Sequence, residues 1–141
     1  MPQNAKPGNS ETHERLQQLR DRLLALHKIL VESEQEDYEK TFGKVSSSNQ
    51  LLNLVMNDPW FAWLHPLSQL IVSMDEALDE KEPLTNAVVD ALVKQSSALL
   101  VASEAGEGFP RHYFDALQRD PDVVLAHADA ARLFNPKKSV T

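Results

Sequence analysis

The chain of 141 residues has the length of one ordinary domain, which is enough to bury a hydrophobic core without disulfides or a structural metal. It contains no cysteine, and this excludes disulfides, thiolate metal ligands, iron–sulfur clusters and cysteine nucleophiles. The formal net charge is −7 and lysine and arginine form no compact cluster, so the composition argues against a nucleic-acid partner.

Composition also indicates the class of protein. Hydrophobic residues make up 42% and charged residues 25% of the chain, which is typical of globular proteins, and four glycines are few for a loop-rich fold. No segment approaches the roughly 18–20 consecutive apolar residues of a membrane span, and the first residues lack the apolar region of a signal peptide. We therefore expect an acidic, soluble, cytoplasmic protein with no membrane partner.

The two ends of the chain differ in composition from the rest. Residues 1–10 are polar and contain two prolines and a glycine, and the end of the chain, "NPKKSVT", is similar. This composition predicts disordered tails at 1–10 and 136–141. A single helical domain is expected between them, over residues 11–135.

A long amphipathic helix is predicted first. Ser10 is an N-cap candidate, and the helix is expected to continue through Tyr38 to about Phe42 and to end at Gly43. Its apolar face is a leucine stripe with alternating spacings of three and four residues: Leu16, Leu19, Leu23, Leu26 and Leu30. A helix of this length requires packing partners along most of that face.

The second predicted helical layer has two parts. The loop "VSSSNQ" precedes a short helical run, "LLNLVMN", and Asp58 followed by Pro59 then indicates a new helix start. The strongest helical stripe of the chain follows: Trp60, Leu64, Leu67, Ile71, Met74 and Leu78.

Two more layers complete the expected fold. The main apolar stripe of the third helix, which follows Pro83 and ends near Ser103, is Leu84, Val88, Ala91, Leu92, Leu99 and Ala102. The fourth layer begins with a short helix, "RHYFDALQRD", that uses Tyr113, Phe114 and Leu117. After a restart at Asp120–Pro121 a last helix runs to Phe134, and no stretch shows the alternation of a strand. The pattern predicts an all-α, antiparallel up-down four-helix bundle whose second and fourth helices are interrupted near prolines.

The tryptophans supply the candidate site. Trp60 and Trp63 lie on the apolar sector of the second layer, at the level where His27 and Glu34 interrupt the apolar sector of the first helix. A buried indole N–H normally finds an acceptor. We therefore predict that His27 or Glu34 accepts a hydrogen bond from an indole.

Three interpretations of these four residues remain open. They form a buried polar network that determines helix register, they line a small-ligand pocket between helices, or His27 and Glu34 act as base and acid of an enzyme. No Glu-x-x-His pair, His-Glu-x-x-His motif, phosphate-binding glycine loop or Gly-x-Ser-x-Gly sequence is present. No metal or other cofactor is therefore expected.

Association is predicted from the third helix. Val89, Val93 and Leu100 form a second apolar line on the side away from its main stripe. Exposed apolar surface usually marks an interface, so this line predicts a homodimer unless the fourth layer covers it. The sequence thus favours a non-enzymatic helical bundle that acts through self-association or contacts with another protein, and the alternative is a bundle that binds a small ligand beside the tryptophans.

Overall fold

The computed structural model describes the backbone of residues 2–134 and the side chains of residues 11–134. Within these residues there are six α-helices and one short 3₁₀ helix, and no strand. The elements are α1 (Pro2–Phe42), α2 (Ser48–Asn57), η1 (Pro59–Leu64), α3 (His65–Asp79), α4 (Asn86–Leu99), α5 (Phe109–Arg119) and α6 (Pro121–Ala131). The all-α fold class predicted from the sequence is confirmed.

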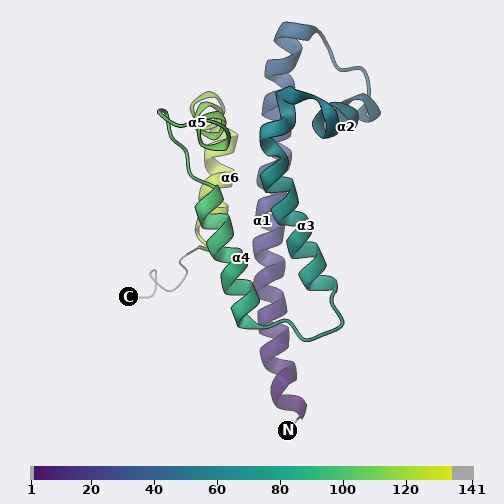
Figure 1. The fold of residues 1–141 in the computed structure, drawn as a ribbon, viewed down its shortest axis with the longest axis vertical. Helices are drawn as coiled ribbons and strands as arrows, with labels where there is room; N and C mark the ends of the chain where they lie inside the picture. The colour runs from purple at the N-terminus through teal and green to yellow at the C-terminus, as the bar shows by residue number, and fades with distance from the viewer. Residues whose placement is uncertain (1, 135–141) are drawn as a thin grey trace.

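The helices are arranged around α1. Figure 1 shows α3, α4 and α6 running along the length of α1, whereas α2 and α5 lie across it near one end of the molecule. The most extensive helix contacts of α1 are with α6 and α3. A four-helix bundle is not confirmed, because six helices are present and two of them leave the common axis. None of the described helices combines the length and hydrophobicity that crossing a membrane requires.

The leucine stripe of α1 is the centre of the core. Its members are between 0% and 1% exposed: Leu16, Leu19, Leu23, Leu26 and Leu30. The 41-residue helix is about 60 Å long at 1.5 Å per residue. It begins at Pro2, within the segment expected to be a disordered tail, and this difference is understandable because lengthening an existing helix costs much less than nucleating one. The predicted tail at 136–141 lies outside the described residues.

A glycine ends α1 where the sequence predicts it. Gly43 has a φ of +94°, a conformation that strains other residues, and its N–H donates to the Glu39 carbonyl oxygen at 3.0 Å. The Val45 N–H then donates to Glu39 Oε2 at 2.8 Å, and this bond is the main cause that lowers the pKa of the Glu39 carboxyl. The turn leads the chain away from the α1 axis and into α2.

Two Asp-Pro pairs make the other sharp changes of direction. The backbone N–H of Asp58 donates to the Leu54 carbonyl oxygen and closes α2. The Asp58 carboxylate accepts a hydrogen bond from the backbone N–H of Trp60 at 2.8 Å and opens η1. Asp120 does the same between α5 and α6, and accepts from the Asp122 N–H at 2.9 Å. Each aspartate therefore caps two helices at once, so the interruptions expected near prolines become separate helices.

The core is shared unevenly among the helices. Buried hydrophobic side chains come from α1, η1, α3, α4, α5 and α6. By contrast, α2 has no buried residue, although five of its ten residues are hydrophobic. The helix that lies across the end of the molecule is therefore the one whose apolar face the fold leaves most open.

Truncating the leucine stripe should destabilise the whole domain. Leu23→Ala leaves a cavity at a fully buried position, and we expect it to lower the free energy of unfolding by about 2–5 kcal/mol in urea titrations. Leu125→Ala on α6 is the matched control, because Leu125 is 67% exposed and should cost less than about 0.5 kcal/mol. Equal losses in the two variants would contradict the assignment of the core.

Candidate functional site

The two tryptophans pack into different parts of the core. Trp60 lies edge-on to Tyr38 and Phe42 of α1, with ring centroids 5.8 and 5.6 Å apart. Trp63 contacts Phe109 of α5, with ring centroids 5.2 Å apart, and stacks on the imidazole of His112 in the same helix, with ring centroids 5.3 Å apart. The indoles therefore anchor η1 to α1 on one side and to α5 on the other, and they form no common wall of a pocket.

The predicted hydrogen bond to an indole is wrong. Both indole N–H groups, of Trp60 and Trp63, are buried without a hydrogen-bond partner among the described residues. His27 Nε2 lies instead 2.8 Å from Ser68 Oγ of α3. Burial lowers the pKa of His27, because the interior disfavours the charged imidazolium. Helical periodicity predicted these groups at similar heights, but His27 meets α3, while the indoles pack against aromatic side chains of α1 and α5.

Glu34 is part of a separate ion pair. It is 6% exposed, and its Oε2 accepts from Arg119 Nη2 of α5 at 2.8 Å. Arg119 Nε also donates to Ser33 Oγ at 3.1 Å, and its Nη1 lies 3.8 Å from Asp37. The buried carboxylate thus has a charge partner, whose side chain is 28% exposed and which ties the end of α5 to α1, so its arrangement supports the structural interpretation of Glu34.

Breaking this pair should cost stability. Arg119→Met leaves Glu34 buried without its cation, and we expect the free energy of unfolding to fall by roughly 2–4 kcal/mol. The double variant Glu34→Met/Arg119→Met removes both charges and should recover most of that loss. A double variant that is as unstable as Arg119→Met, measured by urea denaturation, would contradict the assigned pairing.

A second polar pair, which is part-buried, joins α5 to α6. The Tyr113 hydroxyl lies 2.6 Å from His127 Nδ1, and Tyr113 is fully buried. Burial raises the pKa of the Tyr113 hydroxyl and lowers the pKa of His127. Both shifts favour the neutral forms, which suits a hydrogen bond between uncharged partners in the core.

The lowered pKa values of His27 and His127 predict a pH dependence of stability. In the unfolded chain each imidazole titrates near its ordinary value of 6.5, whereas in the fold it binds a proton only at lower pH. The unfolded state therefore binds more protons below pH 6.5, and the free energy of unfolding should fall as the pH decreases from 7.5 to 5.5. His27→Gln and His127→Gln should each flatten this dependence in urea titrations, and an unchanged slope in both variants would contradict the prediction.

The third helix predicted from the sequence is α4 in the structure, and it turns a different face inward from the one expected. Val89, Val93 and Leu100, predicted to form the dimer interface, are 0%, 9% and 5% exposed and belong to the core of the single chain. Val88, placed on the main stripe, is 42% exposed instead. The prediction of an interface on this line is therefore wrong, because these side chains are buried within the same chain. The most extensive contacts of α4 are with α3 and α1, and not with the fourth layer that the sequence offered as the alternative cover.

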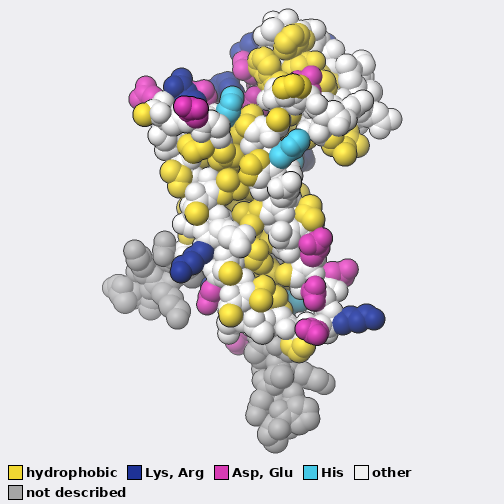
Figure 2. All heavy atoms as spheres, viewed as in Figure 1, with side chains coloured by type: hydrophobic (Ala, Val, Ile, Leu, Met, Phe, Trp, Pro, Cys, Tyr) yellow, Lys and Arg dark blue, Asp and Glu magenta, His cyan; other side chains and the backbone are white. Residues whose placement is uncertain are grey.

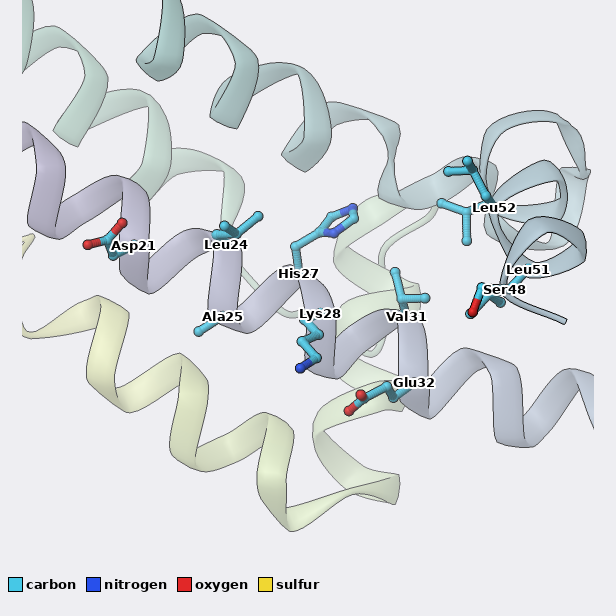
Figure 3. Close-up of a pocket in the computed structure, with 11 residues that line it drawn as sticks. Asp21, Leu24, Ala25, His27, Lys28, Val31, Glu32, Ser48, Leu51 and Leu52 are labelled. Atoms are coloured by element: carbon cyan, nitrogen blue, oxygen red, sulfur yellow. The ribbon is translucent and has the colours of Figure 1, made fainter. Parts of the chain in front are cut away.

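A large apolar groove lies between α1 and α2. Its volume is about 790 Å³. Its hydrophobic lining comes from both helices: Leu24, Ala25 and Val31 of α1, and Leu51, Leu52 and Val55 of α2. Figure 3 shows His27 beside this lining, and Lys28 and Glu32 extending from the other side of α1. We call the space that these residues line the α1–α2 groove.

Exposed hydrophobic side chains surround the groove. Figure 2 shows hydrophobic side chains gathered on the surface at the end of the molecule where α1 ends and α2 lies. Leu52 is 57% exposed and Met56 is 60% exposed. Sequence reasoning missed this site, although one signal was visible: "LLNLVMN" is a short, uncharged and strongly apolar segment with no partner assigned to it.

No metal site accompanies the groove. Among residues 2–134, no three histidine, aspartate or glutamate side chains gather so that they could hold a metal ion. Comparison with known proteins adds no further information about the site, since no family model, curated protein or solved structure matches this chain. The chemistry of the groove must therefore be read from its own residues.

Proposed function

We propose that this chain is a protein-interaction module that binds an apolar helical segment in the α1–α2 groove. The observation that carries the proposal is the state of α2, which has five hydrophobic residues among ten and none buried. A role in protein contacts was already favoured by the sequence. We place this protein contact at the α1–α2 groove, and not at the interface that the sequence predicted on the third helix.

The cost of leaving this surface open supports the proposal. Removing apolar surface from water contributes roughly 25 cal/mol per Å², and monomeric proteins rarely leave large contiguous apolar patches exposed. Here α2 is held by its caps and by contacts with η1, while Leu52 and Met56 stay in water. A partner that covers these side chains would recover the hydrophobic free energy that the single chain leaves unused.

The dimensions of the groove match a short helix. Its lining on α1 extends from Asp21 to Glu32, which corresponds to about 18 Å, or roughly three helical turns, at 1.5 Å per residue. The hydrophobic part of this lining, from Leu24 to Val31, spans about 12 Å, or two turns. An apolar groove of this kind is typical of sites that receive the apolar face of an amphipathic helix. Polar groups lie around the hydrophobic lining: Asp21, Lys28, Glu32 and Ser48.

A small apolar ligand is the second candidate for the same groove. The volume of about 790 Å³ lies within the ~300–1,000 Å³ typical of ligand pockets, and His27 supplies a polar group beside the apolar lining. This candidate keeps one residue of the predicted pocket, His27. It leaves out the tryptophans and Glu34, which are engaged elsewhere.

A designed peptide tests the first candidate. We expect a fluorescein-labelled, 14-residue amphipathic helix with leucines at one face to bind the full chain saturably in fluorescence anisotropy titrations. Leu24→Glu should weaken this binding at least about tenfold, because a carboxylate would then face the apolar side of the peptide. Leu24 is 40% exposed, so the fold should tolerate the change.

Two comparisons make the peptide experiment decisive. Leu125→Glu introduces the same charge at an exposed apolar position of α6, outside the groove, and should leave the affinity unchanged. The same variants are titrated with a fluorescent fatty acid. Fatty-acid binding that Leu24→Glu abolishes, together with no peptide binding, would contradict the first candidate and support the second.

A further inference from the structure

We infer that the helix received by the α1–α2 groove is α2 of a second copy of this chain. The inference rests on the proposed function and names its partner. Each copy would insert its α2 into the groove of the other, so that two grooves and two helices are covered in one reciprocal homodimer. This interface is distinct from the predicted one on the third helix, whose side chains are buried within a single chain.

The charge distribution favours a second copy at this surface. Two copies of a chain with a net charge of −7 repel one another over most of their surfaces. However, α2 (SNQLLNLVMN) contains no charged residue. Its entry into the groove brings no like charge against Asp21 or Glu32, which are among the residues that border the groove. The uncharged helix is therefore a surface on which two copies can meet without direct charge repulsion.

The apolar side chains of α2 fall into two sets. Leu51, Leu54 and Val55 pack against the hydrophobic core of their own chain. Leu52 and Met56 are four residues apart, so they lie on one side of the helix, and they are 57% and 60% exposed. The first set attaches α2 to its own chain. Of the second set, Leu52 borders the groove of its own chain and Met56 lies outside the lining, and both are exposed enough to be covered by a second copy.

The length of α2 agrees with the length of the groove. Ten residues form a helix of about 15 Å, and the twelve residues from Asp21 to Glu32 that border the groove span about 18 Å at the same rise per residue, so α2 fits within that length. Because α2 also lines the groove of its own chain, its exposed side chains lie beside the opening. A two-fold axis near α2 can therefore bring both pairs of surfaces together, and the assembly closes without leaving either groove open.

The mass of the full chain in solution is the first test. We expect light scattering during size-exclusion chromatography to give twice the 15.8 kDa chain mass at high concentration, and the single-chain mass on dilution. The double variant Leu52→Glu/Met56→Glu should weaken dimerisation at least tenfold. Both residues are exposed, so circular dichroism should show unchanged helicity. Leu125→Glu is the matched control and should remain a dimer.

Cross-linking tests the geometry of the interface. The chain has no cysteine, so single cysteines report one position each. A tagged Leu24→Cys variant mixed with an untagged Met56→Cys variant should form a mixed disulfide in mild oxidant, several-fold faster than with Val101→Cys. Val101 is the control because it is 49% exposed and outside the groove.

The outcomes separate this inference from the function on which it rests. A chain that is monomeric at all concentrations but binds the designed peptide overturns the exchange of α2 and leaves the groove as a site for another protein. A dimer that persists in Leu52→Glu/Met56→Glu, or that cross-links no faster through Met56→Cys than through Val101→Cys, also overturns it. A monomer that does not bind the peptide contradicts both proposals.

Discussion

The continuous leucine stripe of α1 is the constraint on which the rest of the structure depends. Five leucines, each no more than 1% exposed, lie along one face of a helix about 60 Å long, and α3, α4 and α6 lie along that helix. Burial of this stripe provides the hydrophobic free energy that holds distant parts of the chain together. Because these helices cover the leucine stripe, α2 packs only at one end of the molecule.

Polar contacts refine an arrangement that the hydrophobic core establishes. Three polar contacts each join two helices: Glu34–Arg119 joins α1 to α5, His27–Ser68 joins α1 to α3, and Tyr113–His127 joins α5 to α6. Buried polar groups of this kind are costly if unpaired, so they favour one relative position of the helices over others. Each has a partner within the fold, and His27 in addition borders the α1–α2 groove.

The exposed surface of α2 is a consequence of how its ends are capped. Gly43 turns the chain away from α1, and Asp58 closes α2 while opening η1, so α2 is held across the end of the molecule instead of along its side. Trp60 and Trp63 then anchor η1 in the core just after this turn. Local capping thus creates an apolar groove at a place where the core gives α2 no buried position.

The sequence by itself determined the helical class, the face that α1 buries, and the starts and ends at Gly43, Asp58 and Asp120. These features depend on periodicity and capping, which act between residues close together in the chain. Only the tertiary structure decided that Glu34 meets Arg119, that Val89 faces inward, and that α2 and α1 enclose a groove. Periodicity gives the direction of a side chain about its own helix axis, but the neighbour it meets depends on how all the helices cross.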